Sequence, residues 1–182
     1  MGRNMATYNF YLKNATSDAF NPGEGGLYTI GLEMKALFDE VCQLDACPFS
    51  DSDFWWDPTT VSDTSLLVYF VDGKGSSLVH KVKPKWPLGA GGTTHISTAD
   101  NLSEVYVSAA TNNANPARAL AVLAFHEAMH NLLKMGQSLH GSGGMDLAAV
   151  KVFSNSKLTQ KNKDLMAGVM GDKILQNTSF LI

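Results

Sequence analysis

The sequence predicts an α+β fold, in which a small β-sheet packs on an N-terminal helix and on a central helix, with a further helix near the C-terminus. Short runs of β-branched and aromatic residues, each of strand length, recur through the first 114 residues. Apolar residues instead recur at helical spacing in residues 30–44 and in the segments from residue 115 onward.

The composition is that of a globular protein. The chain has 182 residues, of which 45% are hydrophobic and 17% charged, so a single domain covering residues 1–182 can bury a core. We divide it into a sheet-containing part, 1–114, and a part with the central helix and the C-terminal helices, 115–182. The net charge of −3 provides no basic footprint for nucleic acid, so DNA and RNA are not expected as partners.

A membrane-embedded protein is not expected either. No run of about 18 apolar residues could span a bilayer. Residues 1–6 lack the charged start and the apolar core of a signal peptide. We therefore expect a soluble chain, and its compartment stays open, because it could be secreted or delivered as part of a larger protein. The oligomeric state also stays open.

Cys42 and Cys47 are the only cysteines, and their separation does not match a CxxC motif. They form either a local disulfide in an oxidising compartment or two free thiols in a reducing one. A catalytic thiol is not expected, because no histidine lies near them in the sequence.

The elements of the first part follow from local patterns. Tyr8–Lys13 alternates aromatic and polar residues, which predicts a strand, and Ile30–Leu44 has apolar residues at helical spacing. Ser65–Val71 is β-branched and aromatic, which predicts a buried strand. Asp72-Gly73 favours a hairpin turn, so Ser77–Val82 is predicted to be the partner strand.

Two isolated histidines lie in this part. His80 is expected to be an exposed strand residue. His95 follows two threonines in a short predicted strand and is interpreted as structural, with contact to a substrate or a metal as the alternative. Val105–Ala109 is predicted to be a further strand.

The central helix is predicted to begin at Asn115 and to end at Gly136. Asn115 is a good N-cap, and Pro116 suits the first helical position, where its missing N–H is not needed. Gly136 is expected to stop the helix. Because small and apolar residues dominate between these ends, the helix is predicted to be buried around most of its circumference.

Two histidines and a glutamate interrupt this apolar helix in the sequence HEAMH. His126 and His130 are spaced i, i+4, which places both rings on one face, close enough to bind one ion. In the H-E-x-x-H pattern the imidazoles bind zinc, while the glutamate, here Glu127, takes a proton from the metal-bound water and passes it to the leaving amine. The alternative is a structural histidine pair, although unpaired polar groups are costly to bury.

A catalytic zinc needs a third protein ligand. No Glu occurs after Glu127, which excludes a glutamate on a later helix. His140 is the first candidate, because the chain can leave the helix at Gly136 and return through residues 137–139 to the metal. Asp146 is the second candidate.

These residues resemble the metzincin zinc peptidases, whose pattern H-E-x-x-H-x-x-G-x-x-H is followed by a methionine in a tight turn below the metal. The same residue types occur here in the same order, as His126, Glu127, His130, Gly136, His140 and Met145. The spacing departs from the family, because Leu133 occupies the position of its glycine and His140 lies four residues beyond Gly136 instead of three. A longer active-site helix would accommodate this difference.

The resemblance implies a small twisted mixed β-sheet above the central helix, and a C-terminal helix under the site. A peptide substrate would lie antiparallel along an edge strand, for which residues 91–98 or 104–109 are candidates. It also implies Zn²⁺ as the cofactor, held by His126, His130 and His140. The implied activity is that of a zinc-dependent endopeptidase.

Two alternatives accompany this interpretation. An aspzincin-like zinc peptidase would use Asp146 as the third ligand, and a non-catalytic peptide-binding module would keep the histidines for structural reasons. Beyond the motif, Leu147–Phe153 and Leu158–Leu175 are predicted to be helices, with Ser156 or Thr159 as the cap of the second.

Overall fold

A computed structural model describes residues 6–17, 26–42, 65–96, 102–136, 140, 157–170 and 173–181. The described chain has an α+β fold, as predicted. Its helices and strands are, in chain order, β1 (Ala6–Asn14), α1 (Gly26–Cys42), β2 (Ser65–Val71), α2 (Leu78–Val82), β3 (Gly92–Thr94), β4 (Leu102–Tyr106), α3 (Pro116–Leu133), α4 (Gln160–Met170) and β5 (Lys173–Leu181). Two 3₁₀ turns, Lys74–Ser76 and Val107–Ala109, follow β2 and β4.

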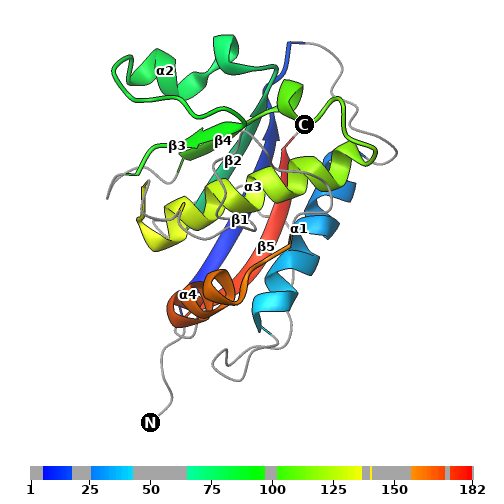
Figure 1. Ribbon diagram of the computed structural model, residues 1–182, viewed down its shortest axis with the longest axis vertical. Coiled ribbons are helices and arrows are strands. Elements are labelled where there is room, and N and C mark those ends of the chain that lie inside the picture. The colour runs from blue at the N-terminus through cyan, green and yellow to red at the C-terminus, as the bar shows by residue number, and fades with distance from the viewer. Residues whose placement is uncertain are drawn as a thin grey trace.

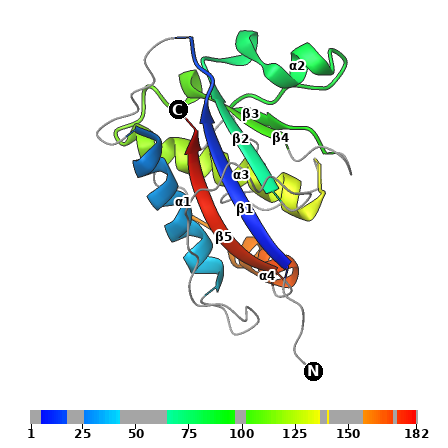
Figure 2. The same cartoon turned by 180° about the vertical axis from the view of Figure 1, so that it is seen from behind.

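The strands form one mixed sheet in the order β3-β4-β2-β1-β5 (Figures 1 and 2). β1 pairs in parallel with β2 and β5, and β2 pairs in parallel with β4. β3 alone is antiparallel, and within the described sheet it pairs only with β4. The short antiparallel strand is therefore an edge of the sheet.

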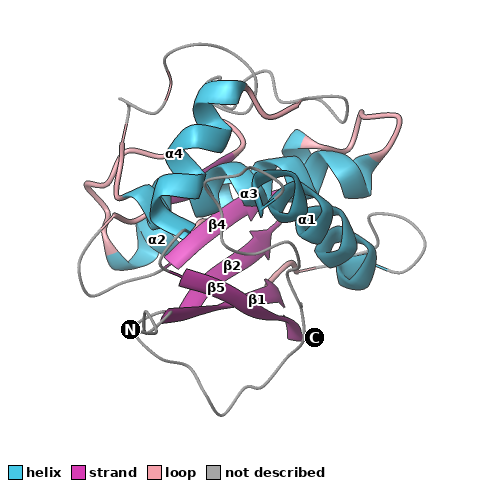
Figure 3. Cartoon of the chain, turned by 90° about the horizontal axis from the view of Figure 1, so that it is seen from below, coloured by secondary structure: helices cyan, strands magenta, loops and turns pink. Residues whose placement is uncertain are grey.

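Helices α1, α3 and α4 cover one face of this sheet (Figure 3). The core between them contains side chains of β1, β2 and β4, and the rings of Phe38 in α1 and Phe125 in α3 lie 4.5 Å apart. Every residue of α3 from Ala119 to Asn131 is buried, which confirms the prediction of a helix buried around most of its circumference.

The predicted strands at Tyr8–Lys13 and Ser65–Val71 are confirmed, and so is the N-terminal helix. The prediction for Ser77–Val82 was wrong, because Leu78–Val82 forms the helix α2. The Ser77 hydroxyl accepts a hydrogen bond from the backbone N–H of His80 at 2.9 Å, which is an N-cap contact. His80 is exposed, as expected, but lies on this helix.

The C-terminal prediction also needs correction. The predicted helix Leu158–Leu175 is shorter, because α4 ends at Met170 and Lys173–Leu181 forms β5 beside β1. The cap at Thr159 is confirmed, since its hydroxyl accepts a hydrogen bond from Asn162 N at 3.1 Å. The sheet is therefore not confined to residues 1–114, and pairing with β1, remote in sequence, decides the conformation of the last strand.

Several predictions fall on residues outside the described ranges, namely Met145, Asp146, the helix Leu147–Phe153, Ser156, Cys47 and the side chain of Cys42. In the part of the chain that is described, no helix combines the length and the apolar character needed to cross a membrane.

Candidate metal centre

The helix α3 begins as the sequence predicts. The side-chain oxygen of Asn115 accepts a hydrogen bond from Arg118 N at 3.0 Å, and Pro116 occupies the first turn. Arg118 also reaches α1, where its Nη1 lies 3.0 Å from Glu33 Oε2. These contacts fix the start of the helix. The HEAMH residues lie in its second half, which is buried in the molecule.

His126, His130 and His140 come together at the C-terminal end of α3. Their Nε2 atoms are separated by 3.0 Å between His126 and His130, 2.9 Å between His130 and His140, and 3.2 Å between His126 and His140. Three nitrogens bound to one tetrahedral ion at about 2.0–2.1 Å lie about 3.3–3.4 Å apart. The triangle of Nε2 atoms is thus close to the size that a single ion requires.

The second ring nitrogen of His130 fixes its tautomer. Its Nδ1 lies 2.6 Å from the backbone oxygen of Met135, and because a carbonyl can only accept a hydrogen bond, Nδ1 carries the proton. In the neutral ring Nε2 then presents its lone pair to the other two histidines, which is the form that binds a metal. Burial lowers the pKa of His130 below its ordinary value, which also favours the neutral ring.

The way in which α3 ends brings the backbone oxygen of Met135 to the His130 ring. Lys134 has a left-handed backbone, with φ 52° and ψ 37°, and its N–H donates to the Asn131 oxygen, while Met135 N donates to the His130 oxygen at 3.2 Å. This pair of bonds is a Schellman motif. The prediction that Gly136 ends the helix was wrong, because Lys134 takes the left-handed position two residues earlier. Gly136 instead lines the cleft beside the histidines.

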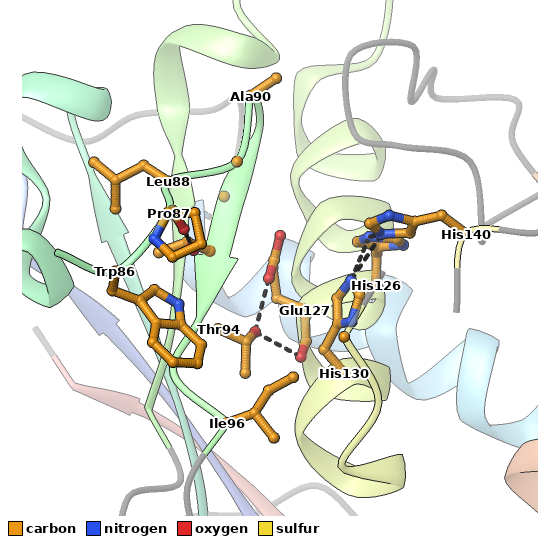
Figure 4. A pocket seen from close by; sticks show the side chains of 14 residues that line it. Trp86, Pro87, Leu88, Ala90, Thr94, Ile96, His126, Glu127, His130 and His140 are labelled. Atoms are coloured by element: carbon orange, nitrogen blue, oxygen red, sulfur yellow. Dashed lines mark hydrogen bonds between the residues drawn. The ribbon is translucent and has the colours of Figure 1, made fainter. Parts of the chain in front are cut away.

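Glu127 lies between the three histidines and the edge strand β3 (Figure 4). The hydroxyl of Thr94 lies 2.7 Å from Glu127 Oε2 and 2.9 Å from the Glu127 backbone oxygen. Burial raises the pKa of Glu127 to about 8, the hydrogen bond from Thr94 opposes this rise, and the charge of Glu104 adds to it. A carboxyl group with a pKa near neutrality is suited to accept and release a proton.

Gly92 allows β3 to approach this carboxyl group closely. A Cβ atom at position 92 would lie 2.9 Å from Glu127 Oε1 and 2.5 Å from the backbone oxygen of Glu104. Both distances are too short for any side chain, so only glycine fits between the neighbouring strand and the helix at this point.

A cleft of about 250 Å³ runs between the edge strand and the histidines. Figure 4 shows His126, His130 and His140 on one side and Trp86, Pro87 and Leu88 on the other. The cleft is lined by Trp86, Pro87, Leu88, Gly89, Ala90, Gly92, Thr93, Thr94, Ile96, His126, Glu127, His130, Gly136 and His140.

His95 follows β3 but does not join the other histidines among the described residues. Its ring is buried and packs edge-on against Trp86, with ring centroids 4.7 Å apart. This packing supports the structural interpretation and helps to hold Trp86 at the cleft.

Sequence reasoning missed Thr94, Gly92 and Trp86. Thr94 and Glu127 are 33 residues apart, and no local pattern couples them. The repeated glycines and threonines near residue 92 predict only a loop and a short strand. A glycine in a strand can mark a close approach of another backbone, so Gly92 itself was a usable signal. The sequence did not indicate which segment approaches it.

The three histidines form a group that can hold a metal ion. Imidazole nitrogens suit several transition metals, so the donor set alone does not specify which metal is bound. No model of a known protein family matches the chain, and comparisons with characterised proteins and with solved structures find no significant match.

Proposed function

We propose that this protein is a zinc-dependent peptidase. The observation that carries the proposal is the convergence of three Nε2 atoms, from His126, His130 and His140, within 3.2 Å of one another. A buried glutamate with a raised pKa lies next to the same histidines in the sequence and faces the same cleft. This combination of groups is the one that hydrolysis of an amide needs.

Zinc fits the donor set, because it accepts three histidine nitrogens and leaves a fourth position open. When bound there, it would supply Lewis acidity, which lowers the pKa of water and polarises a carbonyl group. The carbonyl oxygen of Met135 would hold the His130 ring in the orientation that binding requires. His140 completes the triad from outside the helix.

Glu127 is the proton carrier in this proposal. As a carboxylate it accepts a proton from the attacking water, and it then delivers that proton to the nitrogen of the leaving amine. Thr94 orients the carboxylate through its 2.7 Å hydrogen bond. A divalent ion near Glu127 would favour the ionised form, and so would bring its pKa down from about 8 toward the range in which it acts as a base.

The edge strand β3 supplies the binding surface for the peptide. It pairs on one side with β4, and Gly92, Thr93 and Thr94 line the cleft. An unpaired strand edge can bind another extended chain through backbone hydrogen bonds, which are independent of its sequence. Such a chain would lie between Trp86 and the histidines, beside Glu127.

The test begins with metal content. Elemental analysis of the purified wild type should find one zinc per chain, and His140→Ala should reduce it, whereas Asp146→Ala should not. Retained zinc in His140→Ala together with loss in Asp146→Ala would favour the aspzincin-like alternative. No zinc even after reconstitution would overturn the proposal and leave the non-catalytic binding module.

Activity is tested separately, with a library of quenched fluorescent peptides. Wild-type protein loaded with zinc should cleave members of the library, and Glu127→Gln should bind the same amount of zinc without cleaving. Turnover by Glu127→Gln at the wild-type rate would contradict the role assigned to this residue.

A further inference from the structure

Four lysines and no carboxylates occur on the segment that forms one wall of the cleft. Lys74, Lys81, Lys83 and Lys85 are exposed, and no Asp or Glu occurs from Gly73 to Ala99. We call these four lysines the basic rim. The other ten Lys and Arg residues are outnumbered by 17 Asp and Glu, so the chain without the rim would have a net charge of −7. Residues 73–99, which include one wall of the cleft, therefore have a formal net charge of +4 with the histidines neutral, in a chain whose net charge is −3.

Two contacts connect the basic rim to the cleft. The Nζ atom of Lys74 donates a hydrogen bond to the backbone oxygen of Leu88 at 3.1 Å, and Leu88 lines the cleft. Lys85 directly precedes Trp86, whose backbone N–H donates to the oxygen of Lys83 at 2.9 Å. The rim and the wall formed by Trp86, Pro87 and Leu88 thus belong to one continuous segment.

The rim is also fixed relative to the edge strand. The buried carboxylate of Glu104 in β4 accepts hydrogen bonds from the backbone N–H groups of Leu78 and Val79, at 2.8 and 3.1 Å, and from the hydroxyl of Ser77. These bonds hold the first turn of α2 against the strand that pairs with β3. The helix that contains Lys81 and ends beside Lys83 is therefore anchored to β4.

Three of the four rim lysines have no partner of opposite charge among the residues that the structure describes. Within the described residues, Lys81, Lys83 and Lys85 form no ion pair, whereas Lys163 on α4 is 3.3 Å from Glu40. Uncompensated lysines beside a cleft attract anionic groups, and the attraction adds to that of a divalent ion in the candidate centre.

We propose that the basic rim selects acidic polypeptide segments, so that the substrates of the cleft are chains with Asp or Glu close to the cleaved bond. This inference rests on the proposed peptidase function. A polypeptide is favoured over other polyanions because the rim adjoins a strand edge that can bind a peptide backbone. The cleft between them is lined mainly by apolar side chains and backbone rather than by further basic groups.

The test measures binding to zinc-loaded Glu127→Gln protein, so that no probe is consumed. The probes are two fluorescein-labelled 12-residue peptides that differ only in having Glu or Gln at three adjacent positions. In 50 mM NaCl the Glu peptide should bind about fivefold to tenfold more tightly, and 500 mM NaCl should remove this preference by screening. Equal affinities at low salt would overturn the inference.

Matched variants locate the effect. Lys83→Gln/Lys85→Gln should reduce the preference for the Glu peptide by at least half. Lys157→Gln/Lys161→Gln removes the same charge from exposed lysines at and beside α4, at the opposite end of the molecule in Figure 1, and should leave the preference unchanged. An equal loss in both variants would mean that only net charge matters, and would overturn the assignment to the rim.

Other polyanions are tested on the same protein. A 12-nucleotide oligo-dT and phosphatidylserine vesicles should bind more weakly than the Glu peptide, and tighter binding of either would contradict the choice of polypeptide. Cleavage of library peptides by the wild type without any acidic preference would sink this inference and keep the proposed function. A preference in binding without any cleavage would overturn the proposed function and with it the substrate part of the inference, and would leave only the binding of acidic peptides at the rim.

Discussion

The hydroxyl of Thr94 contacts both the side chain and the backbone of Glu127, at 2.7 Å from Oε2 and 2.9 Å from the backbone oxygen. Ser103 supports this arrangement from the next strand, with its hydroxyl 3.0 Å from that of Thr94. Hydrogen bonds therefore join the edge strand β3 to α3 at Glu127, the residue that acts as the base in the proposed reaction. The position of the Glu127 side chain therefore depends on a residue outside the group of three histidines.

Replacing Thr94 should impair turnover without removing the metal. Thr94→Val keeps the shape of the side chain but removes the hydroxyl, so kcat should fall about 10- to 100-fold with zinc content unchanged. Thr111→Val is the control, since Thr111 is exposed, is not among the residues that line the cleft, and its hydroxyl donates to the Ser108 oxygen at 3.1 Å. If both variants lose activity equally, Thr94 has no specific role in orienting Glu127.

Replacing Gly92 should disturb both the strand and the site. The added Cβ in Gly92→Ala would lie 2.5 Å from a backbone oxygen, so we expect a loss of about 1–3 kcal/mol in the free energy of unfolding and a lower rate of cleavage. Gly75→Ala is the control, because a Cβ there has no neighbour within 4 Å. Urea denaturation of the two variants should show a change of less than about 0.5 kcal/mol for Gly75→Ala.

Removing the metal should abolish activity while leaving most of the fold. The core between the sheet and helices α1, α3 and α4 is built from apolar side chains such as Phe38 and Phe125, so most of the fold should remain when the ion is removed. After dialysis against a chelator, the far-UV circular dichroism signal should persist. The melting temperature should be lower, because the bound metal no longer stabilises the folded state. Complete unfolding would instead indicate a structural metal.

Tyr106 makes the stability of the protein sensitive to alkaline pH. Burial, the negative charge of Glu104 and the hydrogen bond to it raise the pKa of Tyr106 above its usual value of 10.0. Because the pKa is raised in the folded state, the neutral phenol makes its full contribution to the free energy of unfolding below pH 10. This contribution is lost progressively as the pH rises above that value. Just above pH 10 the Tyr106 phenol ionises in the unfolded chain but stays neutral in the folded chain.

Urea denaturation between pH 9 and pH 11 can measure this effect. The free energy of unfolding of the wild type should fall more steeply above pH 10 than that of Tyr106→Phe, which cannot ionise. All other groups are the same in the two proteins, so their contributions cancel in the difference. Parallel pH profiles for the two proteins would show that Tyr106 is not the group responsible.

The extent to which the sequence predicts this protein depends on the range of the interactions involved. The N-cap at Asn115, the i, i+4 spacing of His126 and His130 and the strand at Ser65–Val71 all follow from interactions within a few residues. Helix periodicity and capping are local properties, so the amino-acid sequence alone is enough to predict these elements.

The tertiary structure decided the rest. Residues 78–82 alternate like a strand but form a helix, because Glu104 from β4 satisfies the N–H groups at its start. The first residues of β5 were predicted as the end of a helix, and the hydrogen-bond partners of this strand lie at the opposite end of the chain in β1. Backbone groups need a partner, and when that partner is remote no local pattern reveals it.

The candidate site divides in the same way. The sequence by itself determined that His126, Glu127 and His130 share one buried helix, because helical spacing fixes their relation. Only the tertiary structure decided that His140 meets them, that Thr94 holds Glu127, and that Gly92 and Trp86 border the same cleft. These contacts join β3, the loop before it, α3 and residue 140, and packing between such segments is set by the whole fold rather than by spacing along the chain.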